Sequence, residues 1–211
     1  MLRARLFALA AAAALVTACA DPTRSRSLDN PQVAGRTLAE QVCSNCHGLR
    51  GASPSQNFPN LAAQQPAYVE AELKSLRDKH RADPGGFIYM WGISRHLTDD
   101  QISQLAEYYA AQPPAPRPTA AAANVDLGRK LFAEGSPARN IPACSTCHGE
   151  TGVGQGPFPR LAAQHREYIY RQLGVLRQGT DNRPLGNVMN GVAHLLTDEE
   201  MRSIAAYVES M

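Results

Sequence analysis

The chain has 211 residues, of which 21 are lysine or arginine and 19 are aspartate or glutamate, a formal net charge of +2. Two of the arginines lie in the first 18 residues, which hold no acid, so a chain that begins after them would be formally neutral. A neutral chain without a basic tract does not fit a nucleic-acid-binding protein, and no nucleic-acid partner is expected.

Residues 1–18 have the layout of a secretory signal. Two arginines precede an apolar run from Leu6 to Val16, which is too short to span a bilayer. The string V-T-A-C that ends at Cys19 resembles the lipobox of bacterial lipoproteins, in which the cysteine becomes the lipidated first residue. Cleavage after Ala20 is the alternative, because A-C-A also fits a signal-peptidase site. We predict a periplasmic lipoprotein held on a membrane surface by acyl chains on Cys19.

Two copies of the string C-x-x-C-H-G follow, one in each half of the chain. They place Cys43, Cys46 and His47 in the first half and Cys144, Cys147 and His148 in the second. Two thiols at this spacing can add to both vinyl groups of one haem while the adjacent histidine binds the iron. A redox-active cysteine pair or half of a zinc site would not need that histidine. The motifs therefore predict two covalently bound haem c groups.

The region after each motif repeats as well. The string F-P-N-L-A-A-Q at residues 58–64 returns as F-P-R-L-A-A-Q at residues 158–164. Between the two halves, residues 113–123 are rich in proline and alanine, which predicts an extended linker. We therefore expect two haem domains, residues 28–112 and 124–211. Domains of this length have a thin apolar core, which the haem would complete.

Apolar periodicity predicts helices, and no stretch has the alternating pattern of a strand. The expected helices cover residues 67–80, 99–112, 128–134, 167–178 and 198–210. Thr98 and Thr197 precede acidic residues and are predicted N-caps of the last helix in each domain. The predicted fold class is all-α, with two tandem haem domains related by the internal repeat.

With His47 and His148 as one axial ligand of each iron, the opposite ligand decides between electron carriage and small-molecule binding. Met90 and Met189 are the leading candidates, because each lies seven residues before an L-T-D string. Both stretches contain glycine and are expected to be non-helical. Core packing is the alternative role for these methionines. The other four histidines lack matched positions in the two halves. His80 and His165 are expected to be solvated. His96 and His194 are expected at the surface or beside a haem propionate.

Other residues are candidates for contacts around the haem. Pro59 and Pro159 follow the motif histidines by 12 and 11 residues. Each proline carbonyl could accept the ring N–H of its histidine, which would orient the ring and raise its basicity. Alternatively, the prolines only shape their loops. Arg77 and Arg177, at matched positions on predicted helices, either reach haem propionates or are solvated.

Several motifs together resemble the cytochrome c4 family over nearly the whole chain beyond the signal: the tandem C-x-x-C-H-G modules, the F-P-x-L-A-x-Q strings, the methionine-to-L-T-D spacing and the I-P-A-C entry to the second site. The resemblance implies two cytochrome c-like domains related by an approximate twofold, with His/Met ligation of both irons. It also implies a periplasmic or membrane-bound respiratory electron carrier, which receives electrons from a quinol-oxidising complex or another donor and feeds a terminal haem-copper oxidase. Trp91, next to Met90, departs from the pattern, so the resemblance does not extend to equal potentials of the two haems.

We expect outer-sphere electron transfer, in which each iron cycles between ferrous and ferric with both ligands bound. Such a protein is not an enzyme. A cytochrome subunit of a larger dehydrogenase, for example a flavocytochrome that oxidises sulfide, would use the same chemistry with a permanent partner. A dihaem peroxidase, or a sensor of carbon monoxide or nitric oxide, would need an open position on one iron, and the matched methionines count against both.

Overall fold

The computed structural model describes residues 26–81, 83–118, 125–179, 182–183 and 186–211. Helices are the regular elements of these residues, which otherwise contain two isolated β-bridges. The predicted all-α class is therefore confirmed. The predicted signal, Cys19 and linker residues 119–123 lie outside the described residues. Within the described ranges, no helix is both long enough and apolar enough to cross a lipid bilayer.

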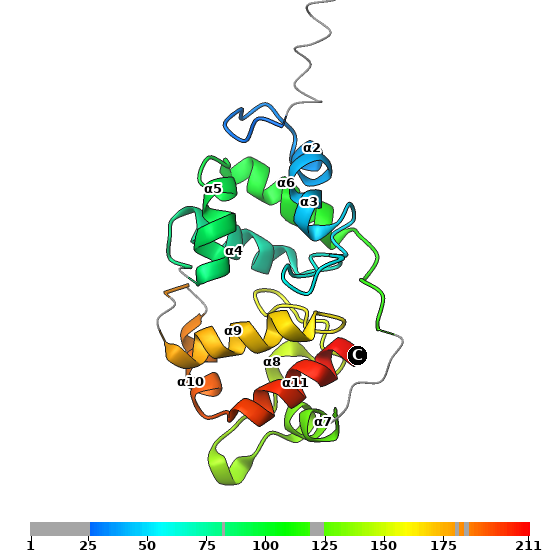
Figure 1. Cartoon of the computed structure of the whole chain (residues 1–211), viewed down its shortest axis with the longest axis vertical. Coiled ribbons are helices and arrows are strands. Elements are labelled where there is room, and N and C mark those ends of the chain that lie inside the picture. The colour runs from blue at the N-terminus through cyan, green and yellow to red at the C-terminus, as the bar shows by residue number, and fades with distance from the viewer. Residues whose placement is uncertain (1–25, 82, 119–124, 180–181, 184–185) are drawn as a thin grey trace, which may run out of the picture.

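The first module forms the upper half of the molecule in Figure 1. A continuous helical segment leads into the first haem motif, a longer helix follows, and a short helical segment precedes the last helix. In chain order the elements are α2 (Gly35–Leu38), the π-helix η2 (Ala39–Cys43), α3 (Ser44–His47), α4 (Pro66–Arg77), the π-helix η3 (Gly86–Met90), α5 (Trp91–Ser94) and α6 (Asp99–Ala110).

The second module repeats this order in the lower half of Figure 1, from yellow-green to red. Its first helix is separated from the haem motif by a loop that contains a short 3-10 turn. The elements are α7 (Val125–Glu134), η4 (Pro137–Arg139), α8 (Ser145–His148), α9 (Arg166–Gln178), α10 (Gly186–His194) and α11 (Asp198–Ser210). Figure 1 shows α4 and α9 facing each other across the boundary between the modules.

The last helix of each module begins at the predicted cap. Thr98 accepts the backbone N–H of Gln101, and the Gln101 side chain accepts the N–H of Thr98. Thr197 and Glu200 form the same reciprocal pair at the start of α11. These capping boxes satisfy backbone donors that the first helical turn leaves unpaired. Both N-cap predictions are confirmed.

Each module has its own apolar core, built where its first and last helices cross. Leu38, Ile102 and Leu105 are buried in the first core, and Phe132 and Ile204 in the second.

A glycine permits the crossing in both modules. A Cβ built on Gly35 would lie 2.5 Å from Cβ of Gln104, and one built on Gly128 would lie 2.0 Å from the carbonyl oxygen of Ser203. The close approach of the two helices therefore depends on the missing side chain.

Candidate haem sites

The two haem motifs have the same local structure. The final cysteine and the histidine of each motif lie in a single helical turn, α3 or α8, that a glycine ends. Gly48 and Gly149 have φ angles of 75° and 78°, in the left-handed region that favours glycine. At Gly48 a Cβ would also lie 2.1 Å from the carbonyl oxygen of Ala52. The chain thus turns sharply after each histidine.

Each motif histidine is buried and held by one backbone carbonyl. Nδ1 of His47 lies 2.9 Å from the carbonyl oxygen of Pro59, and Nδ1 of His148 lies 2.9 Å from that of Pro159. A carbonyl can only accept, so Nδ1 carries the hydrogen and Nε2 keeps the lone pair that a metal requires. Burial lowers the pKa of both imidazoles, which favours the neutral, metal-binding form.

The motif cysteines are partly buried. Burial raises the pKa of Cys43 and of Cys144 to about 11, so both are neutral thiols near pH 7. Apart from these motifs, no group of three or more histidine, cysteine or acidic side chains within the described ranges is arranged to hold a metal ion. The donor set fits thioether attachment of haem better than a zinc site, which needs four such ligands.

The methionine segments differ from expectation, because both are helical. Met90 ends η3, and Met189 lies inside α10. Glycine content made these stretches look like loops, but their neighbours pack on α4 and α9, and tertiary packing outweighs the low helix propensity of glycine.

Large apolar side chains are exposed around both methionines. Tyr89, directly before Met90, is 55% exposed, and Val188, directly before Met189, is 60% exposed. Ile88 is 66% exposed. Apolar surface of this kind is typical of a binding face, and a porphyrin ring placed against the methionine segments would cover it. The residues present therefore fit a haem in each module.

Aromatic contacts link the histidine and methionine sides of the first site. The ring of Phe58 meets His47 edge-on at a centroid distance of 6.2 Å and Tyr89 at 5.7 Å. In the second site Phe158 meets His148 at 6.4 Å, but valine replaces the tyrosine before Met189. The two sites share their histidine geometry and differ on the methionine side.

Trp91 adds to this difference. Its ring stacks on Phe87 with centroids 6.0 Å apart, and Lys79 Nζ lies 4.3 Å from its centroid. The guanidinium of Arg95 lies 5.3 Å from the same ring. The equivalent residue of the second module is Asn190, so the first site alone has an aromatic ring with two adjacent cations at this position.

The two F-P-x-L-A-A-Q loops bind each other across the module boundary, which the sequence analysis missed. Gln164 accepts the N–H of Asn60 at 2.8 Å, and its amide donates to the Asn60 carbonyl at 2.8 Å. Gln64 makes the equivalent pair with Arg160, at 2.6 Å and 3.0 Å. The sequence signal for this interface was a mostly apolar string that ends in glutamine in both halves.

Further bonds join the modules around these loops. Nε2 of His165 lies 3.1 Å from the carbonyl oxygen of Ser53, so the expectation that His165 is solvated was wrong. Its ring is half-buried because it packs against the other module. Gln65 donates to the carbonyl of Val153 at 2.9 Å, at the exposed edge of the interface.

A buried cluster of charges lies at the same boundary. Arg81 pairs with Glu72 at 2.7 Å and with Asp83 at 2.6 Å. Arg183 of the second module lies 3.6 Å from Glu72 and 3.7 Å from Asp83. All four side chains are at most 13% exposed. Two arginines and two acids balance in charge, and the cluster joins the two modules.

The matched arginines of α4 and α9 form exposed ion pairs. Arg77 donates to Asp99 at 2.7 Å, and Arg177 donates to Asp198 at 2.6 Å. Each pair joins α4 or α9 to the first residue of the last helix in the same module. Both arginines are therefore paired with a carboxylate.

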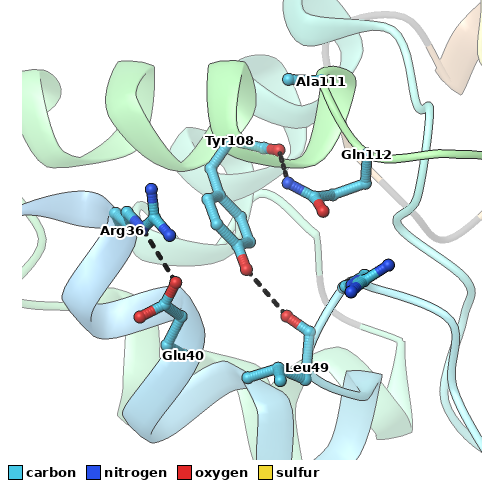
Figure 2. A pocket seen from close by; sticks show the side chains of 7 residues that line it. Arg36, Glu40, Leu49, Tyr108, Ala111 and Gln112 are labelled. Carbon is cyan, nitrogen blue, oxygen red and sulfur yellow. Dashed lines mark hydrogen bonds and ion pairs between the residues drawn. The ribbon is translucent and has the colours of Figure 1, made fainter.

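Figure 2 shows a hollow on the first module, between α2, the turn after His47 and the end of α6. Arg36 pairs with Glu40 at 2.8 Å, and the Tyr108 hydroxyl donates to the carbonyl of Leu49 at 2.9 Å. Its polar groups thus largely bind one another, and none of its lining residues is a motif cysteine or a methionine. The hollow is separate from the haem site.

Two C-x-x-C-H sites, each with a buried, carbonyl-bound histidine in an all-α module, define a c-type cytochrome with two covalently bound haems. Comparison with known proteins agrees. The family model for cytochrome c matches the chain twice, at residues 32–111 and 125–211.

Individual relatives identify the family within the c-type cytochromes. A cytochrome c-552 of Acidithiobacillus ferridurans is 40% identical over 80% of this chain and 73% of its own length. A cytochrome c4 of Thiocapsa roseopersicina is 35% identical over 86% of this chain and 93% of its own. The solved structure of cytochrome c4 from Acidithiobacillus ferrooxidans superposes with a TM-score of 0.75 at 40% identity, over 80% of this chain and 98% of that one. The chain belongs to the cytochrome c4 family and is a dihaem, cytochrome c4-like electron carrier.

Proposed function

We propose that His47 and Met90 bind one haem iron, that His148 and Met189 bind the other, and that the protein moves single electrons between redox partners. Haem c supplies the ferrous/ferric couple. With these four side chains holding the irons in both oxidation states, no position would be left for a substrate, so the proposed role is that of a carrier and not an enzyme.

The observation that carries this proposal is the repeated histidine geometry. In both modules a buried imidazole donates from Nδ1 to a proline carbonyl at 2.9 Å, which fixes the ring and leaves the lone pair of Nε2 for a metal. Such an acceptor raises the basicity of a metal-bound histidine. This bond supports a permanent axial role for both histidines and a haem-directed role for Pro59 and Pro159.

Matched methionine positions support the second axial ligand. Met90 and Met189 are half-buried and lie beside exposed apolar side chains in both modules. Met201, in contrast, is fully buried in the core of the second module, and Met211 is the last residue. Methionine sulfur favours ferrous iron and raises the reduction potential, so two high-potential haems are expected.

The module interface supports electron transfer within one chain. The loops that carry Pro59 and Pro159 are hydrogen-bonded to each other, and buried charges hold the same boundary. One module can therefore receive an electron and the other deliver it without a change in their arrangement.

The axial assignment is tested by the weak far-red absorption band that methionine sulfur gives ferric haem c. Met90→Ala and Met189→Ala are each expected to remove roughly half of the band, because each iron contributes separately. Met211→Leu is the matched control and should keep all of it. A band that keeps its full intensity in either alanine variant contradicts the assignment for that module. Carbon monoxide binding by the reduced wild-type protein would indicate an open position and favour peroxidase or sensor chemistry.

A terminal oxidase is the acceptor we propose, with a sulfur-compound dehydrogenase as a second candidate partner. A thiosulfate dehydrogenase electron acceptor of Stutzerimonas stutzeri is 33% identical over 82% of this chain and 80% of its own length, which supports the second candidate. Size-exclusion chromatography of the native extract tests whether a dehydrogenase is a permanent partner. A freely diffusing carrier elutes at its own mass, whereas a permanent dehydrogenase subunit elutes with its partner.

We also propose that the mature chain begins at a lipidated Cys19 and stays on the periplasmic membrane surface. The signal-like layout of residues 1–18 and the V-T-A-C string support this. Cys19→Ser is expected to move the holoprotein from the membrane fraction to the soluble periplasmic fraction. If wild-type protein is already soluble, with an N-terminus that follows Ala20, the anchor is excluded.

A further inference from the structure

The peptide group that binds each motif histidine is itself bound from the other module. Pro59 C=O and Asn60 N–H are the two ends of one peptide group. The carbonyl accepts His47 Nδ1–H at 2.9 Å, and the N–H donates to Oε1 of Gln164 at 2.8 Å. His47 and Gln164, which belong to different modules, are thus joined through a single peptide plane.

The second site has the same arrangement with the modules exchanged. The peptide between Pro159 and Arg160 accepts His148 Nδ1–H at 2.9 Å and donates its N–H to Oε1 of Gln64 at 2.6 Å. The orientation of both glutamine amides is fixed, because a backbone N–H must meet oxygen and a backbone carbonyl must meet nitrogen.

The glutamines are held firmly in this position. Gln64 and Gln164 are only 5% and 4% exposed. Each follows an alanine in the left-handed region, Ala63 with φ 54° and Ala163 with φ 59°. A non-glycine residue there is strained, and such strain is typical of functional positions.

The strained alanines are anchored to the rest of their own modules. The N–H of Ala63 donates to Tyr109 O, and that of Ala163 to Val208 O, both at 2.9 Å. The last helix of each module thus holds the residue before the glutamine, and the glutamine binds the other module.

We propose that Gln164 and Gln64 are positioning residues that tune the haem of the opposite module. Hydrogen bonds in series polarise one another, so a peptide whose N–H donates to glutamine has a stronger carbonyl acceptor. That carbonyl increases the basicity of the histidine and stabilises ferric iron. Each haem potential therefore depends on a residue of the other half. The proposal rests on the axial role proposed above for His47 and His148.

The peptides at Asn60 and Arg160 are not held equally, so the two glutamine substitutions should differ in the size of their effect. Asn60 also donates from its side chain to the carbonyl of Ala163 at 2.8 Å and accepts the N–H of Ser53 at 2.8 Å. The side chain of Arg160, at the matching position, makes no equivalent hydrogen bond to any residue that the structure describes. The peptide at the first site is therefore held by more bonds, and Gln164→Ala should disturb its placement less than Gln64→Ala disturbs the second.

The test is a redox titration of Gln164→Ala and Gln64→Ala, followed by NMR of the haem methyl groups. Resonances are assigned to a module by their change in Met90→Ala or Met189→Ala. Gln164→Ala is expected to raise the potential of the first haem only, and Gln64→Ala that of the second only. Gln65→Ala is the matched control, because it removes an interface bond that does not involve a histidine-binding peptide, and should shift neither potential.

A purely structural role of the glutamines predicts a different pattern. Loosening the interface would move both potentials together, and a local loop effect would move the haem of the same module. Either pattern, or no shift, overturns the proposal. Gln164→Leu and Gln64→Leu keep most of the buried volume and repeat the test if the alanine variants fold poorly.

The histidine roles are checked separately in the same samples. Paramagnetically shifted ring protons of His47 and His148 in the ferric wild-type protein report binding to iron. If these shifted protons are absent, the proposed ligands are wrong. If they are present but neither glutamine variant shifts the potential of the opposite haem alone, only the tuning by glutamine is wrong.

Discussion

Replacing Gly128 with alanine should destabilise the second module. At this residue α7 crosses α11, and the added Cβ would lie 2.0 Å from Ser203 O and 2.9 Å from Ile204 N. Ordinary van der Waals contact begins at 3.4 Å. Both neighbouring atoms belong to the backbone and cannot rotate away, so the two helices must move apart by more than an ångström.

The size of the effect follows from two opposing terms. Forcing a methyl group into a packed core costs about 1–3 kcal/mol, and more where backbone must shift. The better helix propensity of alanine offsets less than about 1 kcal/mol. A net loss of roughly 2 kcal/mol lowers the melting temperature of a module of this size by roughly 8–16 °C.

Thermal unfolding of the holoprotein, followed by far-UV circular dichroism, measures this loss. Gly174→Ala is the matched control, because Gly174 also lies inside a helix and a Cβ there has no atom within 4 Å. It should melt at or slightly above the wild-type temperature. Gly35→Ala, whose Cβ would lie 2.5 Å from the Gln104 side chain, should fall between the two. Equal melting of the Gly128 and Gly174 variants would refute the packing argument.

Three further variants test other parts of the structure. Burial acts to raise the pKa of Asp83, but the charge of Arg81 outweighs it and the pKa lies below its usual value. Asp83→Asn should therefore cost about 3 kcal/mol near neutral pH. The deficit should shrink as the pH falls from the usual aspartate pKa, where the unfolded chain takes up the proton, through the lowered pKa of the folded protein; a deficit independent of pH would contradict this. Thr197→Ala should lose about 1 kcal/mol in guanidinium unfolding by removing the cap of α11, and an unchanged midpoint would argue against the cap. Arg177→Ala should lose less than about 1 kcal/mol, and less again in high salt, because its ion pair is exposed.

Features with a local cause were predictable from the sequence. The last helix, residues 198–210, has the predicted limits, because Thr197 and the following acids specify its start within four residues. The first helix of the second module was predicted only from Gly128, although it begins at Val125. The methionine segments were mistaken for loops, since glycine lowers local helix propensity and the packing that overrides it comes from α4 and α9.

Features that join the two halves had no local cause. Gln64 and Gln164 each bind residues 96 or 104 positions away, and nothing near them in the sequence indicates which backbone they meet. Pro59 and Pro159 could be proposed as histidine acceptors because each lies at a similar distance behind its own motif. Which module supplies the next bond is a property of the assembled interface and requires the structure.

Trp91 is the only tryptophan of the chain, and it belongs to the first module. It directly follows Met90 and stacks on Phe87. With a haem beside Met90, as proposed above, the light that this indole emits would be absorbed by the haem while the first module is folded. We expect emission to increase when that module opens. The chain therefore carries an intrinsic optical reporter for the unfolding of one of two nearly duplicate halves, without a label.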